Sequence, residues 1–467
     1  MSQSAQWING TNAEATSERP IRRLSTLEFL LRYPVFLLAF GPPILRPKST
    51  FAGVDTSQSH FDFWSILQVG WVFAIALRAI IRLSFGHQMH LTRQARSILK
   101  YVLFLGLVFT ASVAYSPGAV LSGEFSILYF VTWICFVEFL SDAYQNPPDW
   151  LQCLFVIRLI LVVLLALVAI CSVVQPSLVL AVTEGAGIRF SGGAIAPVGV
   201  IGPIIAIISA YSFLNFLERR SRSLLLFLAG VISTFVTQAR GSEIALFLCL
   251  AILGFGWAKS GKRIAYLLVS ATVALVLLAT LVLVDVGADR IWDKFNRGQD
   301  SQGVLTLSGR TEMWSDIVAY TFTHPQGMGY MSGLRTFRGG HFAMNLHSNL
   351  NNIGGADSSY FEVLADAGWL SMAFYLLILG KTAALGWRFA KKHPVKPFAP
   401  DLAARHAIHC ALLLFFFCLV EEVEDTGFSN PLRPEFYFQD IFIAIILGVC
   451  ASLVLASRAR RAYSAAS

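Results

Sequence analysis

A single arginine stands in a short turn between two apolar segments of the chain. Arg240 lies within Thr237-Gln238-Ala239-Arg240-Gly241-Ser242-Glu243, where Ser242 can cap the helix that follows. A guanidinium at a helix N-terminus can bind a phosphate through two parallel hydrogen bonds, and the helix dipole adds to the attraction. The alternative is an interfacial arginine that reaches lipid headgroups or pairs with Glu243. Arg240 is therefore a candidate for binding an anionic substrate.

A long polar segment, residues 287–358, interrupts a chain that is otherwise built from apolar stretches. Loops of this length inside a compact protein are uncommon and tend to be functional. Its candidate binding residues are basic: Arg310, Arg335, Arg338, His341 and His347. A solvated loop with scattered charges is the simpler interpretation of Arg335, Arg338 and His341, whereas a chemical role is equally compatible with His347. The abundance of Arg and His favours an anionic substrate at this loop.

One helix is predicted inside this polar segment. Residues 310–323 place Met313, Ile317 and Tyr320 on one stripe, and Ser308 can cap the helix. The sequence Pro325-Gln326-Gly327-Met328-Gly329 ends it. We expect this amphipathic helix to lie along the outer membrane surface and to direct Arg310 toward the mouth of the site.

Acidic and aromatic residues mark the start of the apolar stretch that follows the loop. Asp357, Tyr360, Glu362 and Asp366 come in quick succession, and the last two share a helix face because they are four residues apart. Ionisable groups inside a membrane span are costly, which makes them functional candidates. The alternative is that Glu362 and Asp366 pair with loop arginines.

The elements that must position these residues are membrane helices. The chain has 467 residues, of which 55% are hydrophobic and only 14% charged, and apolar runs of membrane-spanning length recur along it. We therefore predict an all-α polytopic membrane protein with about twelve transmembrane helices. The predicted spans are 29–46, 61–85, 98–116, 120–140, 150–174, 195–217, 222–238, 243–258, 263–286, 359–388, 405–420 and 437–457. The predicted order is a disordered tail (1–28), helices one to nine (29–286), the large loop (287–358), helices ten to twelve (359–457) and a tail (458–467).

The distribution of positive charge predicts the orientation. The net charge is +8, and the excess of Lys and Arg lies in alternate short loops between spans, as the positive-inside rule requires. Both termini are therefore predicted to be cytoplasmic and the large loop to be periplasmic. This pattern explains the basic charge without nucleic acid. We expect no disulfide, metal or cofactor, because no cysteine is spaced as a ligand. Arg158, inside the fifth span, is expected to pair with Glu138 as a structural ion pair.

Taken in order, the polar segments resemble the O-antigen ligase and polymerase superfamily of bacterial envelope glycosyltransferases. The resemblance covers residues 186–380 and rests on the following sequences: Ala239-Arg240-Gly241-Ser242; Gly309-Arg310-Thr311-Glu312-Met313-Trp314; His324-Pro325-Gln326-Gly327-Met328-Gly329; and Ser359-Tyr360-Phe361-Glu362 through Asp366-Ala367-Gly368. Arg189 with Gly192 resembles a further family segment before the sixth span. In one respect the chain departs from the ligases, which usually have a His just before the tyrosine where this chain has Asp357-Ser358-Ser359-Tyr360. Either Asp357 takes that role or His347 does, and the missing His favours a polymerase.

The resemblance and the chemistry together imply an inverting, metal-independent glycosyltransferase. The donor would be an oligosaccharide on a polyprenyl diphosphate in the membrane, and Arg240 and Arg310, with Arg189, would stabilise the diphosphate as it leaves. Asp357 or His347 would accept the proton of the acceptor hydroxyl. Arg335, Arg338, Tyr360, Glu362 and Asp366 are the expected substrate-binding residues. The resemblance also implies a flippase and a chain-length regulator as partner proteins.

Three other functions are compatible with some of these features. A ligase that transfers finished glycan to lipid A core or another acceptor would use the same residues. A transporter of anions or lipid-linked sugars predicts charges along a path across the membrane and repeated halves, whereas here the charges gather on one face. A purely structural membrane scaffold would not require both Arg240 and Arg310 on one side.

Overall fold

The computed structural model describes the chain in separate stretches. These are residues 63–85, 91–145, 222–237, 242–248, 310–331 and 358–392, with single residues and short runs between 159 and 213 and at 415 and 419. The elements are α2 (Phe63–Ser84), α3 (Arg93–Ser112), the 3-10 helix η4 (Val113–Tyr115), α4 (Ala119–Gln145), β1 (Leu180–Thr183), β2 (Gly187–Phe190), α7 (Arg222–Thr237), α12 (Arg310–Thr323) and α15 (Ser359–Lys392).

Helices occupy five of the predicted spans. The predictions 61–85, 98–116, 120–140, 222–238 and 359–388 correspond to α2, α3 with η4, α4, α7 and α15. Among the described residues, Arg93–Tyr115 and Ser359–Arg388 are long and apolar enough to cross a membrane. The other predicted spans fall wholly or mostly outside the described residues, so the total of twelve stays a prediction.

Helix α3 begins five residues before the apolar run that predicted it. Thr92 has an extended backbone, and its side-chain oxygen accepts a hydrogen bond from Ala95 N at 3.1 Å. This N-cap satisfies one of the free N–H groups of the first turn, so the helix extends through the polar residues Arg93 and Arg96.

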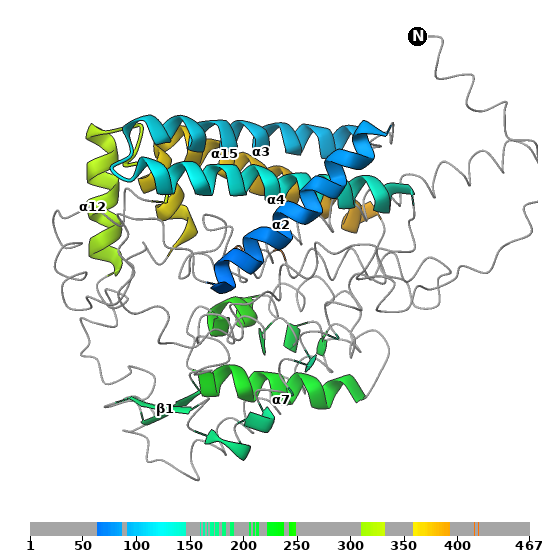
Figure 1. The fold of residues 1–467 in the computed structure, drawn as a ribbon. Helices are drawn as coiled ribbons and strands as arrows, with labels where there is room; N and C mark the ends of the chain where they lie inside the picture. Colours follow the sequence, from blue (N-terminus) through cyan, green and yellow to red (C-terminus); the bar gives the residue numbers. More distant parts are fainter. Residues whose placement is uncertain are drawn as a thin grey trace, which may run out of the picture.

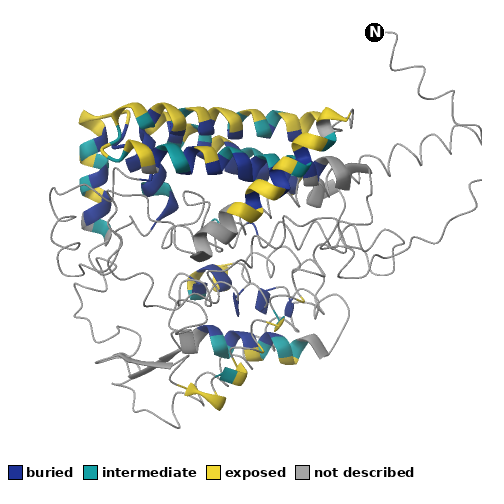
Figure 2. Ribbon diagram, in the orientation of Figure 1, coloured by how far each residue is buried: buried dark blue, intermediate teal, exposed yellow. Residues whose placement is uncertain are grey.

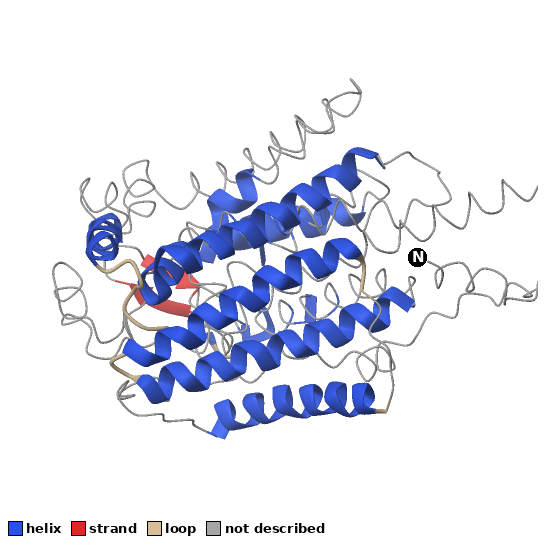
Figure 3. Cartoon of the chain, turned by 90° about the horizontal axis from the view of Figure 1, so that it is seen from above, coloured by secondary structure: helices blue, strands red, loops and turns tan. Residues whose placement is uncertain are grey.

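Four helices form a bundle in which α4 contacts α2 and α3, and α3 contacts α15 (Figures 1 and 3). Helices α3 and α15 run antiparallel. Phe104 stacks on Phe374 at a centroid distance of 5.6 Å, and Lys381 Nζ lies 4.4 Å from the centroid of the Tyr101 ring. The buried faces of these helices meet one another and their exposed apolar faces point outward (Figure 2), as expected for helices surrounded by lipid.

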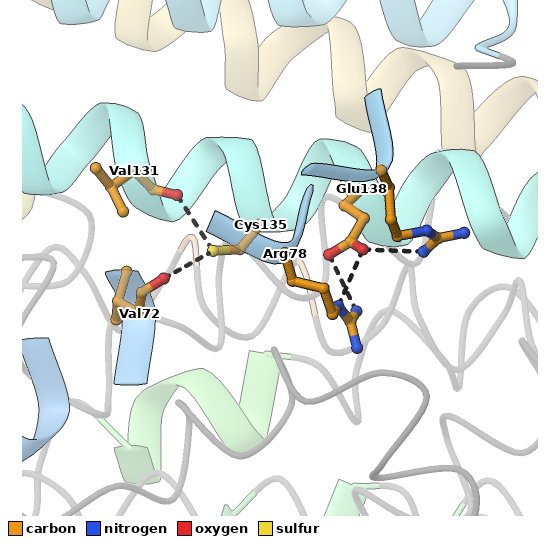
Figure 4. A network of polar contacts seen from close by, with 6 residues as sticks. Val72, Arg78, Val131, Cys135 and Glu138 are labelled. Atoms are coloured by element: carbon orange, nitrogen blue, oxygen red, sulfur yellow. Dashed lines mark hydrogen bonds and ion pairs between the residues drawn. The ribbon is translucent and has the colours of Figure 1, made fainter. Parts of the chain in front are cut away.

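Charged side chains join α2 to α4 at the end of the bundle away from α12 (Figure 4). Glu138 is buried and receives two hydrogen bonds from Arg78, Nε to Oε1 at 3.1 Å and Nη2 to Oε2 at 3.0 Å. Arg82 Nη1 donates to Oε1 at 2.9 Å. We call Arg78, Arg82 and Glu138 the ion triad. The expected partner of Glu138 was Arg158, which lies outside the described residues; the structure pairs Glu138 with α2, because α2 is the helix that packs against this face of α4.

A short β-hairpin departs from the all-helical prediction. Strands β1 and β2 pair antiparallel, with Leu180 opposite Phe190 and Thr183 opposite Gly187. The sequence around the connection contains Glu184-Gly185-Ala186 between two runs that include the β-branched residues Val182 and Ile188. Such a pattern is typical of a hairpin, but four-residue strands are too short to stand out in a chain dominated by long apolar runs.

Candidate functional site

Helix α12 packs against the first part of α15, crosswise to α3 (Figures 1 and 3). Its bounds are those predicted from the sequence. Trp314 stacks on Phe361 of α15 with the ring centroids 4.7 Å apart. The buried cluster between the two helices consists of Met313, Trp314, Ile317, Met328, Leu364 and Ala365. Met313 and Ile317 are thus buried as predicted, whereas Tyr320 is only partly buried and packs on the edge of the cluster.

Helix α15 is broken where it meets the loop. Ala367 (φ −135°, ψ 16°) and Gly368 (φ 74°, ψ −167°) leave the helical conformation, so the carbonyls before the break and the N–H groups after it lack partners within the helix. The turn after α12 supplies these partners. Met328 N donates to Ala365 O at 2.7 Å, Gly329 N donates to Asp366 O at 2.8 Å, and Trp369 N donates to Pro325 O at 3.1 Å. We call residues 325–331 together with 365–369 the interlock.

Two glycines allow the backbones of the interlock to approach this closely. Both Gly327 (φ 83°) and Gly368 (φ 74°) adopt positive φ angles that other residues rarely adopt. A Cβ atom on Gly368 would lie 1.9 Å from Pro325 O, and one on Gly327 would lie 2.6 Å from Gly368 N. Gly327 of the His-Pro-x-x-Gly-x-Gly sequence and Gly368 of α15 therefore act together. They allow the turn after α12 to form hydrogen bonds with the break in α15.

The interlock is anchored on α3 and α4 through Tyr330. Its ring, which is fully buried, stacks on Phe109 with the centroids 4.0 Å apart and the planes 2° from parallel. Its backbone N–H donates to Ser112 Oγ at 2.9 Å, and its carbonyl accepts from Ser122 Oγ at 2.5 Å. Tyr115 adds a further contact, because its hydroxyl donates to Gln326 O at 2.5 Å. The loop is therefore held to residues more than 200 positions earlier in the chain.

The two carboxylates at the start of α15 are buried in this structure. Asp366 Oδ2 accepts a hydrogen bond from Met331 N at 2.9 Å, and Met331 has a positive φ of 61°. An ionised carboxylate is a strong acceptor for a backbone N–H, so Asp366 stabilises this unfavourable backbone conformation. Glu362 lies one turn earlier on the same helix face and is 5% exposed. Tyr360, on the same turn, donates its hydroxyl to Leu419 O at 2.9 Å.

The structure locates the backbone of two of the predicted phosphate-binding arginines. Arg310 is the first residue of α12, and Arg189 lies in β2, which contacts α7. Figure 1 shows the hairpin and α12 on the same side of the molecule, with α12 in the upper part and the hairpin near the bottom. Helix α7 ends at Thr237, three residues before Arg240. The remaining candidates, Arg240, Arg335, Arg338, His347 and Asp357, lie outside the described residues.

In the part of the chain that the structure describes, no group of three or more His, Cys, Asp and Glu side chains is close enough to hold a metal ion. The basic residues and the interlock are the features from which a function must be argued.

Sequence reasoning missed the residues that anchor the loop. Nothing in the local sequence distinguishes these residues from others in a membrane span or loop or indicates contacts across 200 positions. They are Ser112, Tyr115, Ser122 and Tyr330. The glycines Gly327 and Gly368 carried a usable signal, because a glycine after a Pro and a glycine within a long apolar helix each indicate a special backbone conformation.

Membrane-length helices with a loop locked across one end of the bundle are the architecture of a membrane protein. Residues 223–376 match the family model described as O-antigen ligase. This match confirms the resemblance to the O-antigen ligase and polymerase superfamily, and it covers nearly all of α7, the whole of α12 and the first half of α15. It indicates glycan transfer of the O-antigen ligase type. A comparison of the whole chain with curated proteins gives no significant match.

Proposed function

We propose that this protein is an inverting, metal-independent glycosyltransferase that polymerises polyprenyl-diphosphate-linked oligosaccharide repeat units into surface polysaccharide. The observation that carries the proposal is the coincidence of the O-antigen ligase match with the interlock, since residues 223–376 include both partners of that contact. The match by itself supports glycan transfer; the missing His before Tyr360 favours polymerisation.

The arginines provide the chemistry of the leaving group. Arg240 and Arg310, with Arg189, hold the diphosphate and stabilise the charge that develops on it as the bond to the anomeric carbon breaks. Guanidinium groups remain charged and bind phosphate oxygens in pairs, so they supply the positive charge that the departing diphosphate needs.

A base on the same side activates the acceptor. Asp357 or His347 accepts the proton of the acceptor hydroxyl, whose oxygen then displaces the diphosphate from the opposite side of the anomeric carbon and inverts its configuration. Asp357 directly precedes the buried turn Ser358–Ser359 that starts α15, which supports its candidacy. Arg335, Arg338, Tyr360 and Glu362 contribute to substrate binding. Asp366 contributes indirectly, because its carboxylate accepts the hydrogen bond from Met331 N that stabilises the loop.

The proposed orientation places the reaction at the periplasmic face of the inner membrane. The basic residues Arg93, Arg96 and Arg388 lie at the ends of α3 and α15 that are remote from α12, which supports cytoplasmic placement of those ends. The loop 287–358 is then periplasmic and both termini are cytoplasmic. A flippase would deliver the donor to this face, and a chain-length regulator would act on the product.

The second candidate is a ligase that transfers finished glycan from the lipid carrier to lipid A core or another acceptor. The description of the matching family favours it, and the same arginines and base would serve. Transport of anions or lipid-linked sugars is a weaker candidate, because the family match is to a transfer enzyme.

Deletion of the gene in its own host, with complementation, tests the proposal. The complementing forms are wild type, Arg240→Ala, and the control Arg388→Ala, which removes an exposed arginine at the opposite end of α15. We expect long polysaccharide chains to disappear while single repeats still reach the surface, and only wild type and the control to restore length. Full-length glycan accumulating on its lipid carrier would instead identify a ligase. Restoration by Arg240→Ala would contradict the proposed role of that arginine.

A further inference from the structure

Two aromatic side chains are exposed where α12 meets the break in α15. Phe322 is 72% exposed and Trp369 is 39% exposed, and their ring centroids lie 5.5 Å apart. Trp369 Nε1 donates to Thr321 O at 3.2 Å. The polar edge of the indole is therefore bonded to α12, and the two apolar rings face outward together.

This aromatic pair continues an exposed apolar face of α15. Leu370, Leu376 and Leu377 are 58%, 49% and 42% exposed along that helix, and the face ends at Trp387, which is 56% exposed. Trp369 and Trp387 are eighteen residues apart, which is five full helical turns, so they project from the same side of the helix at a separation of about 27 Å.

A pair of tryptophans at this spacing fits the two interfaces of a bilayer. The hydrocarbon core is about 30 Å thick, and Trp and Tyr are enriched where it meets the headgroups. Arg388 is exposed directly after Trp387, as expected for the side where basic residues gather. At the α12 end, Tyr115 at the end of α3 is 41% exposed and joins Trp369 at the same level, since both contact the turn after α12.

We propose that Phe322 and Trp369 form a lipid anchor that inserts into the edge of the bilayer and fixes the C-terminal end of α12 at the headgroup level. The exposed stripe of α12 runs from Ser315 through Ala319 to Phe322, polar at its start and aromatic at its end. Only the last turn of α12 therefore enters the lipid. The start of the helix lies about 20 Å away along its axis, which runs crosswise to α3, and the exposed side chain there is the polar Ser315. This depth assignment is independent of the reaction that the protein catalyses.

Spin-label depth measurements in proteoliposomes test the anchor. In a background with the native cysteines replaced, nitroxides are attached to Phe322→Cys, Ser315→Cys and Leu376→Cys, and collision with oxygen is compared with collision with a water-soluble nickel chelate. We expect the label at 322 to favour oxygen over nickel several-fold more than the label at 315, and to fall between 315 and 376. A label at 322 that is as accessible to nickel as a fully water-exposed label would overturn the anchor, because this position would then face water. Protection of 322 from both agents would also overturn it, since another protein surface would then cover the pair.

A measurement on the wild-type chain covers the case in which a labelled variant does not fold. The protein is reconstituted with phosphatidylethanolamine and phosphatidylglycerol in which a diazirine sits near the glycerol end of one acyl chain. After illumination, we expect lipid adducts on the peptides that contain Phe322 and Trp369, and none on the peptide segment that contains Ser315. Adducts at Leu376 without any at Phe322 or Trp369 would contradict the proposal.

Discussion

The interlock and the ion triad join helices at opposite ends of the molecule by different means. At the α12 end, three backbone hydrogen bonds and two glycines close a break in α15 around the turn after α12. At the other end, a buried carboxylate on α4 accepts three hydrogen bonds from two arginines of α2. The first joint needs close backbone approach, and the second needs opposite charges.

The proposed function places the chemistry at the interlock end, whereas the ion triad maintains the fold at the other end. The interlock fixes the positions of α12 and of the start of α15. It therefore also fixes the backbone positions of Arg310 and of the residues around Tyr360. The ion triad satisfies charges within apolar helices, since both arginines bond to Glu138. Damage to the interlock should therefore reduce transfer, whereas damage to the ion triad should reduce stability.

The largest effect is expected for Gly368→Ala. A methyl group would lie 1.9 Å from Pro325 O and would also oppose the positive φ, so the turn cannot dock without a shift costing about 3 kcal/mol. Transfer should fall about tenfold or more, measured as polysaccharide made per folded molecule. Gly380→Ala is the matched control, because nothing lies within 4 Å of the position of its Cβ atom. Equal activity of the two variants would refute the importance of the interlock.

Glu138→Ala is the counterpart at the other end. Removing the carboxylate leaves Arg78 and Arg82 without this acceptor, and we expect a cost of about 2 kcal/mol, since both arginines are one-third exposed and partly hydrated. The melting temperature in detergent should fall, while transfer per folded molecule is retained. Glu138→Gln, which keeps an acceptor oxygen, should lose less. A variant with full stability and lost transfer would reverse the comparison.

A pair of substitutions at Asp366 separates a role of charge from a role in backbone support. Asp366→Asn retains an oxygen that can accept from Met331 N, so it should retain most transfer activity, whereas Asp366→Ala should lose about 1–3 kcal/mol of stability and most activity. Kinetics with lipid-linked donor would check this. Equal loss in both variants would show that the negative charge of Asp366 is itself required.

The smallest effect is expected for Ser122→Ala, which removes the hydrogen bond from α4 to the Tyr330 carbonyl and the contact of Ser122 Oγ with Ser116 Oγ. The expected cost is about 1 kcal/mol, seen as a modest fall in melting temperature. Ser126→Ala is the control, since its hydroxyl bonds the carbonyl of Ser122 within the same helix. A larger loss from Ser126→Ala than from Ser122→Ala would count against Tyr330 as the anchor of the loop.

The sequence predicted those helices whose limits are set by local patterns. The bounds of α12 follow from its period and from the Pro and Gly residues after it, and the spans follow from the length of each apolar run. The β-hairpin was missed because its strands are four residues long. The break in α15 was missed because Ala367 and Gly368 lie inside a run that is apolar enough to continue as a helix.

Contacts between distant segments were beyond reach of the sequence alone. Glu138 was expected to pair with Arg158, which lies outside the described residues, and its bonds to Arg78 and Arg82 of α2 were not predicted, because no local pattern states which helix packs on which. The same holds for Tyr330, whose partners Ser112 and Ser122 look like ordinary span residues. Among the site candidates, Asp366 was expected to bind substrate, and its visible contact is with the backbone of the loop.

The most direct test compares Arg310→Ala with Glu138→Gln in purified protein. Each variant is reconstituted with a polyprenyl-diphosphate-linked repeat unit, and product per folded molecule and melting temperature are measured together. We expect Arg310→Ala to lose transfer at an unchanged melting temperature, and Glu138→Gln to melt earlier with transfer intact. If Arg310→Ala transfers glycan as wild type does, α12 does not contribute the phosphate-binding arginine and the proposed site is wrong.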